Sequence, residues 1–353
     1  MSAQRTDVVV IGGGQAGLAA GYYLRRAGVD FVVLDAASEP GGAWREMWPS
    51  LRTFSPTIYS SLPGWMMPAW TEDDGYPLAR HVVDYLTRYE QRYDLPVVRP
   101  VRVSRVERSS EGLVVASDSG RWEARAVVSA TGTWSRPFLP AYPGMAEFAG
   151  RHLHTADYRD RTEYAGQRVV VVGGGNSAAQ ILAEVSQVAE TTWVTLRPPR
   201  FLPDDVDGYD LFSIATARRR RVDAGLTDDT GVMGLGDIVM VPSLRDARER
   251  GVLHAEPMFD RLVPKGVAWD DRVLEVDTVI WCTGFRPALS HLSGLGLRNA
   301  AGHIATQGTQ AVDEPRLHLL GYGDWTGPAS ATLIGVGRPA RDAVSSIVEL
   351  LEG

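Results

Sequence analysis

The sequence contains almost no cysteine, since Cys282 is the only one among 353 residues. This excludes an intramolecular disulfide, a redox pair of cysteines and a thiolate-rich metal site. We therefore expect no bound metal. A single thiol agrees with a reducing compartment, and we expect the protein to be cytoplasmic.

The sequence also lacks an excess of positive charge. Asp and Glu number 43 against 36 Lys and Arg, which gives a net charge of −7. Nucleic acid and acidic membrane surfaces are therefore poor partners for it. The basic run Arg218–Arg221 is typical of a solvated surface. No signal peptide is evident, and the uncharged stretch 8–24 is at the short limit for a membrane span.

That uncharged stretch instead has the pattern of a nucleotide-binding unit. Residues 7–11 predict a buried strand, residues 16–26 a helix and residues 31–34 a second strand. Two strands joined through a helix in this way are expected to be parallel.

The turn between the first strand and the helix reads Gly12-x-Gly14-x-x-Gly17. Its glycines permit a tight turn, a close approach of the backbone to a pyrophosphate, and close packing of helix on strand. The N-terminus of the helix favours the phosphate charge. Asp35 ends the second strand, where its carboxylate would accept hydrogen bonds from a ribose.

The pattern occurs a second time. Residues 168–172 predict a strand and 176–188 a helix, with the turn Gly173-x-Gly175-x-x-Ala178 between them. The next strand ends at Leu196, which is 23 positions after Gly173, as Asp35 is 23 positions after Gly12. An internal repeat of this kind indicates two dinucleotide sites.

Two dinucleotide sites in one chain are most simply explained by FAD and a nicotinamide that exchange a hydride. Arg197 follows the last strand of the second unit and would bind a 2′-phosphate, which favours NADPH there. Gly323 and Asp324 end a strand near the C-terminus, where the carboxylate would bind the ribityl or pyrophosphate part of FAD. The helix expected at 337–351 would direct its N-terminus at the flavin ring.

These patterns predict an α/β protein with two Rossmann-like dinucleotide-binding domains. Each would have a central parallel sheet plus a small antiparallel meander, with the second domain inserted in the first. The FAD-binding domain would comprise residues 1–160 and 286–353, and the NAD(P)H-binding domain residues 161–285. We expect a meander at 97–127, a single strand at 273–282, and a functional coil at 45–77.

The segment between the two turns reads Phe148-x-Gly150-x-x-x-His154-x-x-x-Tyr158. It matches the signature of the flavin-containing monooxygenases, and the chain resembles that family. The matches extend over nearly the whole length, and they include Glu39-x-Gly41-Gly42-x-Trp44, Ala130-Thr131-Gly132-x-Trp134 and Cys282-Thr283-Gly284-Phe285. The short chain is similar to a compact bacterial subgroup that includes flavoproteins of arsenic-resistance operons.

The resemblance implies an FAD-dependent, NAD(P)H-consuming monooxygenase that forms a C4a-(hydro)peroxyflavin. It would oxygenate a thioether sulfur or an amine nitrogen, with NADPH as the reductant and NADH accepted by some members of the subgroup. Its partners would be a small-molecule substrate and dioxygen, and a homodimer is the default oligomer. The signature residues His154 and Tyr158 would link the domains rather than transfer protons.

The candidate cofactor-binding residues come from both turns, from the strand ends and from the family motifs. They are Gly12, Gly14, Gln15, Ala16, Gly17, Asp35, Gly42, Trp44, Thr131, Gly132, Gly173, Gly175, Asn176, Ser177, Ala178, Arg197, Thr283, Gly284, Gly323 and Asp324.

The sequence departs from the family at one position beside the expected flavin site. Phe54 stands where many members have an asparagine that holds the oxygenated flavin, and an aromatic ring cannot donate that hydrogen bond. The aromatic loop from Met47 to Tyr76 is our candidate for the wall over the flavin. Two alternatives stay open: a flavoprotein reductase or oxidase without productive oxygenation, and a non-catalytic redox-sensing accessory protein.

Overall fold

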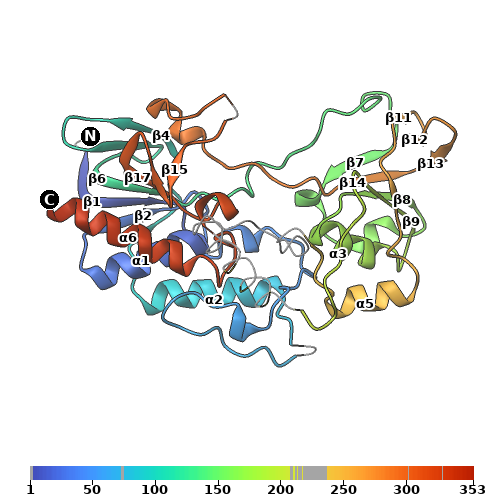
Figure 1. Cartoon of the computed structure of the whole chain (residues 1–353), viewed down its shortest axis with the longest axis horizontal. Helices are drawn as coiled ribbons and strands as arrows, with labels where there is room; N and C mark the ends of the chain where they lie inside the picture. The colour runs from blue at the N-terminus through green and yellow to red at the C-terminus, as the bar shows by residue number, and fades with distance from the viewer. Residues whose placement is uncertain are drawn as a thin grey trace.

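A computed structural model describes residues 3–72, 75–206, 237–300, 302–327 and 329–353, together with residues 210, 213 and 217. The basic run Arg218–Arg221 lies outside the described residues. Figure 1 shows two lobes. The lobe on the left contains both ends of the described chain and is called the first unit. The lobe on the right is called the second unit.

A nine-stranded mixed sheet forms the centre of the first unit. Its order is β15 (Thr306–Gln307), β16 (Gln310–Ala311), β17 (Glu314–Leu319), β6 (Arg121–Ser129), β1 (Gln4–Ile11), β2 (Phe31–Leu34) and β3 (Val97–Val98). Strands β17 to β3 are parallel, as the strand–helix–strand pattern predicts. The antiparallel meander is also present, since β4 (Val103–Arg108) pairs with β5 (Leu113–Ser117) and β5 pairs with β6.

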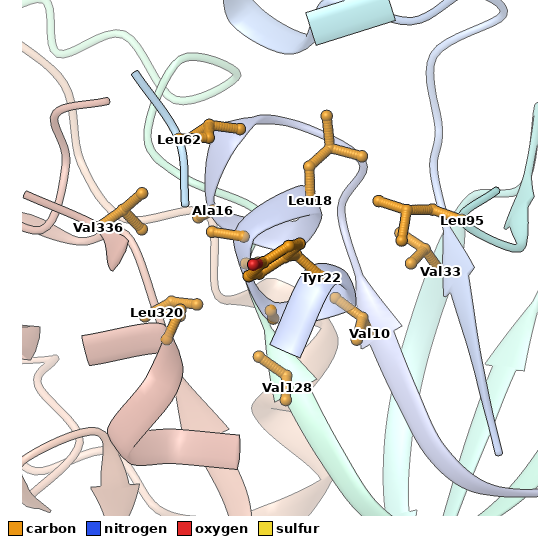
Figure 2. Packing of buried hydrophobic residues seen from close by; sticks show 14 of the residues in the cluster. Val10, Ala16, Leu18, Tyr22, Val33, Leu62, Leu95, Val128, Leu320 and Val336 are labelled. Carbon is orange, nitrogen blue, oxygen red and sulfur yellow. The ribbon is translucent and has the colours of Figure 1, made fainter. Parts of the chain in front are cut away.

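Helices α1 (Gln15–Ala27) and α6 (Gly337–Glu352) pack on this sheet, and α2 (Ala79–Arg92) packs against α1 (Figure 1). Helix α1 ends at Gly28, which adopts a left-handed conformation with φ of 69° and donates its N–H to the last turn. Figure 2 shows α1 enclosed by apolar side chains from the sheet, from the 45–77 segment and from the C-terminal part of the chain. The first turn of α1 is thus held by segments far apart in the sequence.

The second unit is built on a five-stranded parallel sheet. Its order is β10 (Ala255–Pro257), β9 (Glu190–Thr195), β8 (Arg168–Val172), β14 (Thr278–Trp281) and β7 (Arg151–His154). Helices α3 (Asn176–Val185) and α5 (Pro242–Glu249) pack against each other, and strands β11 (Arg261–Val263), β12 (Gly266–Ala268) and β13 (Val273–Glu275) form a small antiparallel sheet. The fold class predicted from the sequence is confirmed.

Two details differ from the sequence prediction. The single strand expected at 273–282 is two strands, β13 and β14, in different sheets. The strand is interrupted at Asp277, whose carboxylate accepts hydrogen bonds from the backbone and side chain of Arg168. Strand β7, which lies within the segment 1–160 expected for the first unit, pairs with β14 in the second sheet.

The two connections between the units run side by side as an antiparallel ribbon. The N–H of Ala288 donates to the carbonyl of Gly132 at 3.0 Å, and the N–H of Phe138 donates to the carbonyl of Gly284 at 2.9 Å. We call these segments, 131–138 and 283–288, the linker ribbon. It fixes the strand ends of one unit relative to those of the other.

The segment expected as a functional coil contains only short 3-10 turns, η1 (Gly42–Arg45) and η2 (Thr57–Tyr59), among its described residues. Its aromatic residues are held from both sides. Trp65 packs on the core of the first unit, whereas Trp48 is a buried member of the core of the second. The coil therefore crosses the junction between the units.

Candidate functional site

The first glycine turn presents bare backbone at the end of β1. Gly12 has a φ of 106°, and a Cβ added there would lie 2.6 Å from the carbonyl oxygen of Ala130. A Cβ at Gly17 would lie only 1.8 Å from the carbonyl oxygen of Gly12. Gly14 faces Gly42, and a Cβ on Gly42 would lie 2.8 Å from the Gly14 Cα. Gly12 and Gly17 therefore admit no side chain, while a Cβ at Gly14 would meet nothing closer than 3.8 Å. Bare backbone of this kind fits the pyrophosphate of a dinucleotide.

Asp35 lies beside this turn and is almost fully buried. Its Oδ2 is 3.3 Å from Nε of Arg99, and Arg99 forms two further hydrogen bonds with Glu90, at 2.7 and 2.8 Å. A Cβ at Gly13 would lie 2.6 Å from the Asp35 Oδ2. Sequence reasoning missed both Arg99 and Gly13. The run of three glycines was a signal for Gly13, but Arg99 had none, because its contact with Asp35 is long-range.

Gln15 and Trp44 meet at the first residue of α1. The indole N–H of Trp44 donates to Oε1 of Gln15 at 2.9 Å, and the Gln15 amide donates to the carbonyl of Ala331 at 2.6 Å. Ala16 is buried, and a Cβ at Gly321 would lie 2.7 Å from its methyl group. The structure thus brings the predicted residues of the turn, of η1 and of the C-terminal loop into one place.

The end of β6 and the end of β17 lie next to each other at this edge of the sheet. Thr131 Oγ1 lies 2.7 Å from the hydroxyl of Tyr322, the residue that precedes Gly323 and Asp324. Gly323 has a φ of 75° and begins the short turn η6 (Gly323–Thr326), in which Asp324 is exposed. An exposed carboxylate near the glycine turn is suited to bind hydroxyl groups of a sugar or a ribityl chain.

The second turn repeats the geometry of the first. Gly173 has a φ of 131°, and a Cβ there would lie 2.4 Å from the carbonyl oxygen of Cys282. Cys282 follows β14 as Ala130 follows β6, so the same contact forms in both units. A Cβ at Gly175 would meet no described atom within 4 Å. Ala178 is buried in the position of the third glycine, so the second turn accommodates a methyl group there.

Asn176 begins helix α3, but its side chain is occupied by the protein itself. Its amide N–H₂ donates to the carbonyl of Asp237 at 3.1 Å, and its Oδ1 accepts the N–H of Val239 at 2.9 Å. Only the backbone of Asn176 is therefore available to a nucleotide phosphate. Ser177 follows it in the first turn of α3 and is partly buried.

Arg197 lies just beyond β9, on the same side of the sheet as the second turn. Its carbonyl oxygen is 3.9 Å from the position of a Cβ at Gly174. The side chain is exposed, and no hydrogen bond or ion pair joins it to the described part of the chain. Arg200, by contrast, is held at 2.7 Å by the buried carboxylate of Asp237. The two arginines therefore differ in their freedom to bind an anion.

The signature residue His154 supports the linker ribbon. Its Nε2 lies 3.0 Å from the carbonyl oxygen of Gly284, and its Nδ1 accepts the N–H of Ala156 at 3.1 Å. The imidazole is therefore neutral with its proton on Nε2, and burial lowers its pKa. This geometry agrees with a linking role and leaves neither ring nitrogen for proton transfer. The hydroxyl of Thr283 donates to the carbonyl of Phe138 in the same ribbon.

Tyr158, the last signature residue, is fully buried against the second unit. Its hydroxyl donates to Oε2 of Glu184 at 2.9 Å, and Ser50 from the 45–77 coil donates to the same oxygen at 2.8 Å. Burial raises the pKa of Glu184. Sequence reasoning missed Glu184, which joins the signature, the coil and helix α3.

Comparison with known proteins places this geometry in a family. A family model described as "Pyridine nucleotide-disulphide oxidoreductase" matches residues 9–224. The solved flavin-containing monooxygenase from Stenotrophomonas maltophilia is 51% identical to this chain over 99% of both chains, with a TM-score of 0.89. The chain belongs to the flavin monooxygenases of this family.

Curated relatives agree with this assignment. An uncharacterized oxidoreductase, CzcO-like, from Geobacillus kaustophilus is 28% identical over 97% of this chain and 98% of the relative. The probable indole-3-pyruvate monooxygenase YUCCA8 from Arabidopsis thaliana is 30% identical over 79% of this chain and 74% of the relative. Membership of this family implies a flavin and a nicotinamide cofactor.

In this flavin monooxygenase, Phe54 lies at the junction between the units. It is partly buried and packs, with Leu51 and Tyr76, on the core of the second unit. Its place beside a bound flavin stays a prediction. Within the described part of the chain, no cluster of three or more His, Cys, Asp or Glu side chains is arranged to hold a metal ion. None of the described helices has the length and apolar character needed to cross a membrane.

Proposed function

We propose that this flavin monooxygenase uses FAD and NAD(P)H to insert one oxygen atom of O₂ into a thioether sulfur or an amine nitrogen. The balanced reaction consumes the substrate, O₂, NADPH and a proton, and it yields the oxygenated substrate, NADP⁺ and water. The proposal rests on one observation. Both units end a parallel strand in the same bare glycine turn against the carbonyl oxygen of the neighbouring strand end, at Ala130 and at Cys282.

FAD is assigned to the first turn because more groups that could bind a dinucleotide surround it than surround the second turn. Gly12, Gly14 and Gly17 would accept the pyrophosphate, Asp35 the adenosine ribose, and Asp324 the ribityl or pyrophosphate oxygens. The N-termini of α1 and α6 add partial positive charge. When bound, the flavin would supply the hydride acceptor and the oxygen chemistry, which no side chain can provide.

NADPH is assigned to the second turn because Arg197 is exposed and has no partner among the described residues. A guanidinium at this position would form charge-assisted hydrogen bonds with a 2′-phosphate. NADH lacks that phosphate and would bind more weakly. The linker ribbon would keep the two cofactors in a fixed relation, which hydride transfer requires.

An uncharged organic substrate is supported by the coil that crosses the junction. Phe54 and Trp65 are partly buried there, and Met66 is 59% exposed. Such apolar surface favours a hydrophobic molecule and excludes water from the reacting atoms.

The test is a measurement of coupling. The purified FAD-loaded protein is mixed with NADPH, O₂ and methyl phenyl sulfide, and three quantities are followed: NADPH consumed, sulfoxide formed and hydrogen peroxide released. The proposal predicts a sulfoxide yield close to the NADPH consumed. A substrate-free reaction is the control, and it should consume NADPH more slowly.

Phe54 supports one alternative function. Since a phenyl ring donates no hydrogen bond at the position where many relatives have an asparagine, electrons from NADPH would reach O₂ without transfer to substrate. The reaction would then convert NADPH, a proton and O₂ to NADP⁺ and hydrogen peroxide. Stoichiometric peroxide with every thioether and amine tried would establish the oxidase and overturn the monooxygenase.

A further inference from the structure

A chain of buried polar side chains runs behind the first glycine turn. His291 Nε2 lies 3.0 Å from Ser129 Oγ, and Ser129 Oγ lies 2.8 Å from the hydroxyl of Tyr322. The Tyr322 hydroxyl lies 2.7 Å from Thr131 Oγ1, which in turn lies 2.7 Å from the carbonyl oxygen of Ala288. Ser129, His291 and Tyr322 are 0%, 4% and 7% exposed. We call this chain the buried relay.

The donor of each hydrogen bond in the relay follows from the contact between Thr131 and the carbonyl of Ala288. A carbonyl oxygen only accepts, so Thr131 donates to Ala288 and must accept from Tyr322. Tyr322 has then used its only proton, so it accepts from Ser129. Ser129 in turn accepts from Nε2 of His291, which fixes the tautomer of that imidazole.

This arrangement satisfies the relay completely. Each hydroxyl donates one hydrogen bond and accepts one, and a chain with all its donors aligned is cooperative. The Tyr322 hydroxyl also accepts the backbone N–H of Thr131, at 3.3 Å. Burial lowers the pKa of His291 to about 4, which agrees with a neutral ring. Removing one hydroxyl would leave its neighbours without partners in the interior.

The relay joins three parts of the chain that meet at the first turn. Thr131 precedes Gly132, which has open space above its Cα and a φ of 60°. Tyr322 precedes Gly323 and Asp324, while Ala288 belongs to the linker ribbon. The loop after Tyr322 is itself rigid, since Ser330 Oγ donates to the carbonyl of Gly323 at 2.7 Å.

We propose that Tyr322 is a positioning residue for FAD, which acts through the buried relay to hold the Thr131 loop and the Asp324 loop in register with the linker ribbon. The proposal rests on the proposed function in assuming that FAD occupies the first turn. Tyr322 itself lies beneath the loops, and its hydroxyl is spent on Thr131, so its effect on FAD passes through those loops.

The test compares Tyr322→Phe with the wild-type protein after removal of the flavin. FAD is titrated back, and its dissociation constant is read from the quenching of FAD fluorescence. Loss of the hydroxyl should raise the dissociation constant about tenfold, because Thr131 and Ser129 lose their common partner. The melting temperature of the flavin-free protein is measured in parallel.

Ser129→Ala and the double variant show whether the residues act in series. Ser129→Ala should raise the dissociation constant of FAD by a smaller factor than Tyr322→Phe. The double variant should bind FAD about as weakly as Tyr322→Phe alone, since an interrupted chain has little more to lose. Independent, multiplied effects would contradict a relay. If Tyr322→Phe does not fold, Ser129→Ala carries the same comparison.

Thr309→Val is the matched control. Thr309 and His318 form another buried hydroxyl–imidazole pair in the first unit, with Oγ1 and Nδ1 3.0 Å apart, and neither belongs to the relay. This variant should lower the melting temperature but leave the dissociation constant of FAD within twofold of wild type. If both variants weaken FAD binding equally, or if Tyr322→Phe does not weaken it, the positioning role is overturned. Wild-type protein that fails to bind FAD would instead overturn the proposed function.

Discussion

Gly17 and Ala178 occupy the same position in the two glycine turns but differ in the space around them. A methyl group at Gly17 would overlap the carbonyl oxygen of Gly12, whereas Ala178 carries its methyl group in a buried site that accepts it. The same position of the motif therefore requires glycine in the first turn but accepts alanine in the second.

We expect Gly17→Ala to lower the free energy of unfolding by about 3 kcal/mol, because the added methyl group meets backbone atoms that cannot rotate away. It should also reduce the fraction of purified protein that carries flavin. Urea unfolding and the flavin-to-protein absorbance ratio measure the two effects.

Ala178→Gly is the control for that substitution. It creates no overlap and should cost about 1–2 kcal/mol, from the lower helix propensity of glycine and the loss of one buried methyl group. A loss as large as that of Gly17→Ala would show that the packing argument is wrong.

At Arg197 we expect substitution to separate the two nicotinamide cofactors. Arg197→Ala removes a side chain that would pair with the 2′-phosphate of NADPH, a charge-assisted contact worth about 1.5–3 kcal/mol. The KM for NADPH should rise about tenfold to a hundredfold, while the KM for NADH changes little. Steady-state NAD(P)H oxidation measures both. Equal changes for the two cofactors would remove Arg197 from the phosphate site.

At the scale of single elements, the contact of α3 with the 45–77 coil depends on one carboxylate. Glu184→Ala leaves the buried hydroxyl of Tyr158 and the hydroxyl of Ser50 without their acceptor. We expect a loss of about 1–3 kcal/mol in the free energy of unfolding at pH 7. Glu184→Gln keeps an amide oxygen as acceptor and should lose less. If the two variants were equally stable, these hydrogen bonds would have no net effect.

Most elements were predictable from the sequence because their signals are local. The buried run at 7–11 and the two glycine turns each fix an element over a few neighbouring residues. The break between β13 and β14 was missed because its cause, the contact of Asp277 with Arg168, joins residues far apart in the chain.

The candidate site divides in the same way. The glycines at 12, 14 and 17 have a spacing that predicts a dinucleotide-binding turn from the sequence alone. Arg99 and the buried relay do not, because each consists of side chains from segments that only the folded chain brings together. The coil that contains Phe54 was expected over the flavin, and its packing on the core of the second unit had no sequence signal.

For the whole molecule, the buried imidazoles predict the response to acid. Burial lowers the pKa of both His291 and His318 from 6.5 to about 4. Between these values the unfolded chain binds more protons than the folded one, so the free energy of unfolding falls as the pH drops from 6.5 to 4. Glu184 acts in the opposite sense, since burial raises its pKa and the fold then gains from its protonation.

This prediction is checked by the melting temperature between pH 4 and pH 7. We expect the steepest loss below pH 6.5 and a shallower dependence in His318→Asn, whose amide can replace the imidazole as partner of Thr309 without titrating. An identical pH dependence in the two proteins would mean that His318 does not contribute to acid sensitivity.

The linker ribbon determines how the second unit can be removed or exchanged. Since Gly132 and Ala288 are joined by a backbone hydrogen bond, the chain leaves the first unit and returns to it at nearly the same place. The second unit is therefore an insertion whose two ends are adjacent. A short turn in place of the second unit would reconnect the two segments of the first unit. A related second unit with another nucleotide preference would fit between the same two positions without distorting either sheet.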